Sequence, residues 1–434
     1  MGIPEKVEVK CSAPGKVILF GEHAVVYGTT AVAASLSDLR IFVQVKLVSL
    51  SSNSSSSPSD ILVKFHDIKD DQGEIIKCRL PFTKLQNFRI LTKVPVFNTS
   101  RPTTEMLVRL REEFQDYNSQ SSQCIMALSY LSANLLSGVL EMFIDSNTML
   151  EIDIYSENLP FGAGLGSSAA FSVALSGALL RLRSLCSQEP NLIEDFACST
   201  PVTDTTSTIT TSGSSKCINP STKILQLVNA WAFISEIIIH GEPSGLDNYT
   251  SCYGGAIKYN NASGNFEQVR IPSLNMLLTN TKVPRSTKVL VGEVRKLHDK
   301  FPGIVKPILS AIEEISVQFL NVAEKFNGDL DSISEELHVE ISKLVDINHD
   351  LLVSLGVGHP SLTIIREASK KKKLACKLTG AGGGGCALTL LPPVRTSWVS
   401  GAEDLFLELT EELSIYGFDC FRSIIAGDGV LFYV

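Results

Sequence analysis

Hydrophobic and polar residues alternate along several short stretches of the chain, and this pattern predicts β-strands. In residues 39–48, for example, Ile41, Val43, Val45 and Leu47 lie on one face of an extended chain. The same reasoning predicts further strands at residues 7–13, 61–65, 74–80, 150–155, 254–259 and 274–279.

Longer stretches carry apolar residues at the spacing of a helix. Residues 169–185 are rich in Ala, Leu and Val, and they predict a helix that follows directly on a glycine-rich run. Other helices are expected at residues 104–114, 122–140, 222–240, 303–326, 335–355 and 401–416, with one more that begins near Ser361. Strands are expected between and after the last of these, at residues 374–377, 386–391, 418–425 and 430–434.

The chain has 434 residues, more than a single hydrophobic core usually serves, so two domains are expected. The pattern changes after about residue 270, which places one domain at residues 1–270 and the other at 271–434. Strands and helices alternate in the second domain in a way that suggests an α+β fold with an antiparallel sheet. The overall class is therefore α/β in the broad sense, with α+β character.

Two segments rich in Ser and Thr, residues 49–59 and 199–215, lack an apolar period. Such a composition cannot bury enough surface to order itself, so the first is expected to be a loose loop and the second a flexible insertion. Neither segment receives a role from its sequence.

Composition narrows the classes of function. The net charge of −8 argues against a nucleic-acid-binding surface. No apolar run has the length expected of a membrane span, and the first ten residues do not resemble a signal peptide. The ten cysteines have no metal-ligand spacing, so they are expected to be reduced thiols. A cytoplasmic protein is expected, and a peroxisomal location stays open.

The run from Pro160 to Ala170, PFGAGLGSSAA, is the strongest chemical signal. Its three glycines allow tight turns and a close approach of the backbone to a ligand. The run connects a predicted strand to a predicted helix, whose free N–H groups and positive dipole end favour an anion. A nucleotide phosphate is the ligand that suits this arrangement, and an ordinary Gly/Ser turn is the alternative.

Three further groups of residues suggest a catalytic cleft. Pro14-Gly15 is expected to break the first strand, so that Lys16 begins a short apolar strand close to Glu22 and His23. Glu236, late in an apolar helix, and Asp247, after the Pro and Gly of a turn expected at residues 240–248, are two acids of which one could hold Mg²⁺ and the other could accept a proton. Each acid alone would more often be a solvated surface residue.

The segment from Lys377 to Cys386, KLTGAGGGGC, contains a second glycine run. Five of the six residues 380–385 are Gly, more than a simple turn requires, which favours a close approach to a ligand.

Taken together and in this order, the P-G-K…G-E-H segment, the G-A-G-L-G-S-S-A loop and the K-L-T-G-A-G-G-G-G-C loop resemble the three motifs of the GHMP small-molecule kinases. The resemblance runs from Ser12 to the C-terminus, interrupted by the two Ser/Thr-rich segments. It implies an N-terminal domain like domain 2 of ribosomal protein S5, a ferredoxin-like C-terminal domain, and phosphoryl transfer from ATP with Mg²⁺.

The resemblance also implies roles for single residues. Asp247 would be the base and Lys16 would lie beside it and the reacting oxygen, while Ser168 and Glu236 would bind Mg²⁺. The implied nucleotide-binding residues are Gly162, Ala163, Gly164, Leu165, Gly166, Ser167 and Ser168, together with Ser156 and Asp67. The residues implied to face the acceptor are Glu22, His23 and Thr287.

Three segments are similar in sequence to those family members whose acceptor is mevalonate, in the synthesis of isoprenoid and sterol precursors. These segments are G-E-H-A-V-V-Y-G, H-G-E-P-S-G-L-D-N and L-T-N-T-K-V-P-R-S-T. Other acceptors stay open, as in galactokinase or phosphomevalonate kinase, and so does a catalytically silent ligand sensor on the same fold. Homodimers are frequent in the family, so a homodimer is expected, with no nucleic-acid or membrane partner.

Overall fold

The structure is a computed structural model that describes residues 7–49, 60–69, 72–92, 94–97, 99–114, 122–144, 148–187, 189–197, 217–325, 333–393 and 402–434. Residues 50–59 and 198–216 lie outside this part of the chain, so the expectations for the two Ser/Thr-rich segments fall almost wholly outside the described residues.

One long strand, β2 (Thr30–Ser49), joins the sheets of the molecule. Its first residues pair with β7 (Ala256–Asn260), and its second half pairs with β5 (Thr148–Glu157). Strand β1 (Glu8–Phe20) runs antiparallel to it for most of its length, and β12 (Asp419–Ile425) meets it near its middle. β2 therefore connects the strands that follow residue 270 to those before it.

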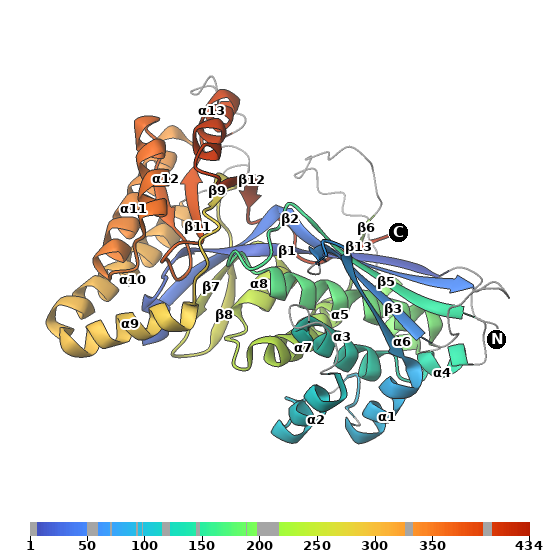
Figure 1. Ribbon diagram of the computed structural model, residues 1–434. Coiled ribbons are helices and arrows are strands. Elements are labelled where there is room, and N and C mark those ends of the chain that lie inside the picture. The colour runs from blue at the N-terminus through green and yellow to red at the C-terminus, as the bar shows by residue number, and fades with distance from the viewer. Residues whose placement is uncertain are drawn as a thin grey trace.

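The second part of the sheet has the order β10-β11-β9-β12, formed by β10 (Cys376–Leu378), β11 (Cys386–Leu390), β9 (Leu274–Asn280) and β12. Each neighbouring pair is antiparallel, which confirms the expected antiparallel sheet. Figure 1 shows the late helices gathered beside these strands at one end of the molecule. These helices are α9 (Thr287–Lys300), α10 (Pro302–Glu324), α11 (Glu335–Ser354), α12 (Pro360–Lys371) and α13 (Ala402–Ser414).

The remaining strands extend the first part of the sheet. They are β3 (Asp60–Lys69), β4 (Ile75–Pro81), β6 (Cys217–Ile218), β8 (Asn265–Val269) and β13 (Leu431–Tyr433). Strand β13 pairs with β1, so the end of the chain returns to the first sheet even though the sequence places it after residue 270. The boundary at residue 270 stays a prediction.

Helix α5 (Ser167–Cys186) lies at the centre of the N-terminal core, where it packs against β1, β2 and α7 (Thr222–His240). Figure 1 shows α3, α5, α7 and α8 on one side of the sheet. The other helices of this part are α1 (Phe82–Thr92), α2 (Thr104–Phe114), α3 (Ser122–Leu135), α4 (Val139–Ile144), α6 (Pro190–Ala197) and α8 (Leu246–Tyr253).

Helices α5 and α7 are long and apolar enough, by length and composition alone, to cross a membrane, contrary to the expectation that no apolar run would be. Their apolar windows are 83% and 56% buried inside the protein. A helix that is apolar on all sides is equally what the centre of a large core requires, so the observation is weak evidence for a membrane.

Two expectations for local structure are wrong. The helix expected at residues 122–140 ends at Leu135, and Gly138, with φ of +82°, precedes a new helix. β1 does not break at Pro14-Gly15 but continues to Phe20 with a shift of register. A Cβ on Gly15 would lie 2.7 Å from the Leu165 carbonyl oxygen, so glycine lets the strand approach the glycine-rich loop without breaking.

Candidate functional site

A cleft of about 900 Å³ lies between the first glycine-rich loop and the second. It is lined from the N-terminal part by residues of β1, the loop and α8, and from the C-terminal part by Arg285, Thr287 and residues 380–381. The predicted site residues on its wall are Lys16, Glu22, His23, Asp67, Gly162, Gly164, Gly166, Ser167, Ser168, Asp247 and Thr287. The structure therefore brings together residues that are as much as 271 positions apart in the sequence, from Lys16 to Thr287.

The first glycine-rich loop requires its glycines. Gly162, Gly164 and Gly166 have φ values of +71°, +82° and +75°, a region that favours glycine. Gly166 is the N-cap of α5 and provides no side-chain cap, so the first N–H groups of the helix remain available to an anion. A Cβ on Gly166 would lie 2.8 Å from Cγ of Lys16, which shows how closely the loop covers that lysine.

Lys16 and Asp247 form an ion pair at the cleft. Nζ of Lys16 lies 2.8 Å from Oδ1 of Asp247, and the two side chains are 10% and 40% exposed. The sequence predicts a turn at Asp247, but this residue stands in the first turn of α8, after the N-cap Gly245 with φ of +85°. The helix fixes the carboxylate, and its exposed fraction leaves the group accessible to a substrate.

Glu236 of α7 is buried close enough to this pair to feel the charges of both members. Its carboxylate accepts hydrogen bonds from Ser168 Oγ at 3.3 Å and Ser172 Oγ at 3.1 Å. Burial, and then the nearby Asp247 carboxylate, raise the pKa of Glu236 to about 8, while the two serine hydroxyls and Lys16 act in the opposite direction. Two carboxylates thus share one lysine.

The chemistry of this group fits a hard divalent cation. Ser168 supplies a hydroxyl oxygen and Glu236 a carboxylate oxygen, the donor types that Mg²⁺ accepts. Within the described residues no three His, Cys, Asp or Glu side chains form a metal-binding group. A cation here would therefore depend on phosphate and water oxygens for its other ligands, as Mg²⁺ commonly does with nucleotides.

His240 is a neighbour that the sequence reasoning did not assign. Its Nε2 lies 2.9 Å from Ser168 Oγ, and the side chain belongs to the last turn of α7. Burial lowers the pKa of His240. The i, i+4 spacing from Glu236 on a helix was the available signal.

Two of the residues expected to face the acceptor have their polar atoms engaged within the protein. The Glu22 carboxylate pairs with Lys377 and accepts a hydrogen bond from Asn348 Nδ2 at 3.1 Å. His23 donates from Nε2 to the Ala381 carbonyl oxygen at 2.9 Å. Thr287 begins α9 on the cleft wall.

Arg285 connects the two glycine-rich loops. Its guanidinium donates to the carbonyl oxygen of Gly384 at 2.9 Å and to that of Ala163 at 3.2 Å. It lines the cleft, and burial lowers its pKa. The sequence assigned it no role, although it stands within the L-T-N-T-K-V-P-R-S-T segment that already carried the resemblance.

On the expected nucleotide side, Asp67 and Ser156 are adjacent. Asp67 Oδ2 accepts the Ser156 backbone N–H at 2.6 Å, and Ser156 Oγ donates to the Leu159 carbonyl oxygen at 2.7 Å. Asp67 lies on the cleft wall, whereas the Ser156 hydroxyl is occupied by this local bond. Ala163 and Leu165 are buried, and each contributes a backbone carbonyl, to Arg285 and to the Lys16 N–H respectively.

Known proteins resemble the chain over most of its length. Residues 134–197 match the GHMP kinases N terminal domain, and residues 330–395 match the GHMP kinases C terminal family. The chain is 37% identical over 426 residues to mevalonate kinase of Homo sapiens, with 96% of this chain and 93% of that protein covered. It is 34% identical over 429 residues to mevalonate kinase of Arabidopsis thaliana, covering 98% and 99%.

A solved structure agrees with these relatives. The structure of L. major mevalonate kinase in complex with R-mevalonate matches with a TM-score of 0.61 at 21% identity, covering 99% of this chain and 100% of that chain. At that identity the likeness concerns the fold. With the two family matches, it confirms the predicted two-domain α/β architecture.

Proposed function

The chain belongs to the mevalonate kinases of the GHMP kinase family, and we propose that the Lys16–Asp247 pair carries out their reaction in the cleft between the two glycine-rich loops. The enzyme phosphorylates the C5 hydroxyl of mevalonate at the expense of ATP, forming 5-phosphomevalonate. None of the findings favours a different acceptor or a silent sensor.

The observation that carries the residue assignment is the 2.8 Å ion pair beside the N-terminus of α5. Phosphoryl transfer requires charge neutralisation, in-line positioning and a group that accepts the hydroxyl proton. The loop and the helix N-terminus supply N–H groups for phosphate oxygens, and the acid next to them supplies the proton acceptor.

Asp247 is the base in this proposal. It accepts the proton of the C5 hydroxyl as the oxygen attacks the γ-phosphorus. Lys16 holds the Asp247 carboxylate in an ion pair at 2.8 Å and stabilises the negative charge that develops on the attacking oxygen. The proton ends on Asp247 and leaves to solvent through its exposed edge.

Mg²⁺, when bound, neutralises the phosphate charge and aligns the γ-phosphoryl group. Ser168 and Glu236 would hold it, and this assignment rests on their oxygen donors and on the excess of carboxylate over cationic charge around them. His240, bonded to Ser168 Oγ, would orient that hydroxyl.

The acceptor is itself an anion, and Arg285 is the cation of the opposite wall. The hydrogen bonds that its guanidinium donates go to backbone carbonyls, so its charge remains available to a carboxylate in the cleft. We therefore assign the mevalonate carboxylate to the Arg285 side, next to Thr287, and the C5 hydroxyl to the Lys16 side. A homodimer and a cytoplasmic location remain predictions.

The function is tested with a coupled ADP-release assay that compares mevalonate, phosphomevalonate, galactose and homoserine as acceptors. Mevalonate should have the highest kcat/KM, and phosphorus NMR of the product should show a phosphate monoester on C5. A higher kcat/KM for another acceptor would contradict the assignment.

A further inference from the structure

The wall of the cleft next to Lys16 is formed by a short segment that belongs to the N-terminal domain by sequence, residues 21–27, here the wall segment. Glu22, His23, Val25 and Val26 of this segment line the cleft. His23 has φ of +59°, an uncommon conformation for a residue with a side chain, and it is held by backbone hydrogen bonds within the segment together with contacts outside it.

Those contacts come from the C-terminal domain. Both oxygens of Glu22 are engaged there, one by Lys377 of β10 and the other by Asn348 of α11. His23 bonds to the carbonyl oxygen of Ala381 in the second glycine-rich loop. Ala24, fully buried, packs into the hydrophobic core of the C-terminal domain.

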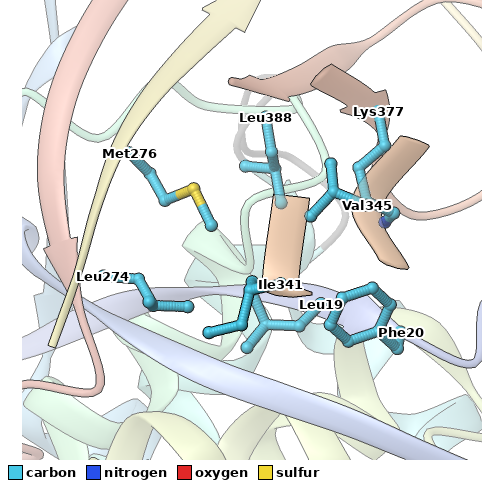
Figure 2. Close-up of a pocket in the computed structure, with 8 residues that line it drawn as sticks. All are labelled: Leu19, Phe20, Leu274, Met276, Ile341, Val345, Lys377 and Leu388. Atoms are coloured by element: carbon cyan, nitrogen blue, oxygen red, sulfur yellow. The ribbon is translucent and has the colours of Figure 1, made fainter. Parts of the chain in front are cut away.

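The Lys377–Glu22 pair is buried among apolar residues. Both side chains are 1% exposed, and the Lys377 ammonium lies 5.8 Å from the centre of the Phe20 ring. Figure 2 shows the Lys377 side chain beside a small cavity that is otherwise lined by Leu19, Phe20, Leu274, Met276, Ile341, Val345 and Leu388. The cavity, about 10 Å³, is at the lower limit for one water molecule and offers it almost no polar partner.

In such surroundings neither charge can be left without the other. Removing one member of a buried pair strands the other in an apolar environment, which costs more than replacing both by neutral groups. The pair therefore fixes the position of the wall segment relative to β10. A carboxylate whose two oxygens are both engaged is also poorly placed to contact a substrate.

We propose that Glu22 is a positioning residue, anchored by Lys377 and Asn348, that holds His23 and the rest of the wall segment at the acceptor side of the cleft without contacting the acceptor. This inference rests on the proposed function, because the wall it describes is that of the mevalonate pocket. It replaces the expectation that the Glu22 carboxylate faces the acceptor.

The test compares Glu22→Gln, Lys377→Met and the double variant Glu22→Gln/Lys377→Met. Lys377→Met strands the Glu22 carboxylate, so kcat/KM for mevalonate should fall by more than about tenfold while KM for ATP changes by less than about threefold. The double variant has no stranded charge, and the side-chain amide that replaces the carboxylate can still accept a hydrogen bond from Asn348. Its kcat/KM should therefore recover to within about fivefold of the wild type.

Lys371→Met serves as the matched control, since this exposed lysine of the same domain pairs with Glu412 away from the cleft. It should leave both KM values unchanged. A double variant that is as poor as Lys377→Met, or poorer than Glu22→Gln, would show that the carboxylate itself acts on the acceptor and would overturn the inference.

If Lys377→Met does not fold, the comparison of Glu22→Gln with the double variant still decides. Positioning predicts that the double variant is at least as active, and direct contact predicts that it is less active. Thermal melting of each variant monitors folding. Mevalonate turnover by the wild type tests the proposed function separately, so the two ideas can fail independently.

Discussion

Replacing Asp247 by Asn should separate its catalytic contribution from its structural one. The amide keeps the shape of the side chain and removes the charge that accepts the proton. Because the side chain is 40% exposed, the ion pair with Lys16 contributes only about 0–1 kcal/mol to stability. Loss of a negative charge in the first turn of α8 adds about 0.3–1 kcal/mol.

The effect on the rate should be much larger. General base catalysis contributes about 10²- to 10⁴-fold, which corresponds to roughly 3–5 kcal/mol of the activation free energy. Asp247→Asn should therefore lower kcat by that factor and leave KM for both substrates within a few-fold, with a decrease in Tm of only a few degrees. If Asp247 only stabilised helix α8, the substitution would lower Tm and leave kcat nearly unchanged.

Lys16→Met tests the other member of the ion pair. Lys16 and Asp247 lie 2.8 Å apart and act on the same oxygen, so removing both should cost little more than removing one. The assay is ADP release at saturating ATP and Mg²⁺, with differential scanning calorimetry of every variant. Glu242→Gln, a change to an exposed acid five residues from Asp247, is the control and should retain wild-type kcat.

An Asp247→Asn variant that keeps near-full kcat and only melts earlier would show that Asp247 is not the base. If the fold-loss of kcat in the Lys16/Asp247 double variant equals the product of the losses in the two single variants, the two residues do not act on the same oxygen. Independent roles give additive free energies.

Three further predictions concern the metal, pH and the second loop. Glu236→Gln should raise the Mg²⁺ concentration needed for half-maximal rate at least tenfold with folding retained, and an unchanged Mg²⁺ titration would remove Glu236 from the site. Burial, followed by the charges of nearby cations, lowers the pKa of His349 from 6.5 to about 3. Below pH 6.5 the unfolded chain therefore binds a proton at this residue that the folded protein does not bind. His349 therefore lowers the free energy of unfolding by at most about 1.4 kcal/mol per pH unit as pH falls below 6.5. The Tm of His349→Asn should fall less between pH 7 and pH 5 than the Tm of the wild type. Equal decreases in the two proteins would exclude His349 as a source of the pH dependence. Gly382→Ala should lower Tm more than Gly356→Ala. Both glycines have positive φ, but a Cβ on Gly382 would lie 2.2 Å from a backbone oxygen, whereas one on Gly356 would meet nothing within 4 Å. Equal decreases in Tm would mean that backbone strain, and not this steric clash, determines the loss.

The elements best predicted from the sequence are those with a long, uniform pattern. The helices expected at residues 104–114 and 222–240 agree with α2 and α7 at both ends. Such segments bury one face or nearly all of their surface, and the apolar period records that burial directly.

Elements whose pattern is short or mixed were not predicted. Helix α8 spans only eight residues and begins in a Pro/Gly-rich stretch, so its sequence suggested a turn. Helix α9 follows a proline and contains charged residues on most of its surface, with Val294 as its buried residue. In both cases tertiary contacts select the helix, and a single sequence does not reveal them.

The same limit applies to the site. Lys16, Ser168, Glu236 and Asp247 stand within or next to recognisable motifs, so the sequence located them, and the structure shows them together. The partners of Glu22 could not be inferred, because Lys377 is 355 positions away and a lysine at the end of a predicted strand is most often solvated. Only the pairing of β10 within the C-terminal sheet reveals that it is buried.

The contacts between the two domains divide into two kinds with different consequences. Apolar contacts, such as that of Phe20 with Phe319 of α10 at 4.9 Å between ring centres, contribute stability but tolerate small rotations, because hydrophobic burial has no preferred direction. The contacts nearest the cleft are instead directional: Arg285 to the Ala163 carbonyl, His23 to the Ala381 carbonyl, and Glu22 to its two partners. In-line phosphoryl transfer is sensitive to displacements of about 1 Å, so alignment of the acceptor wall with the Lys16–Asp247 pair requires contacts of the second kind. Loss of one of these polar contacts should therefore impair turnover before it unfolds the protein.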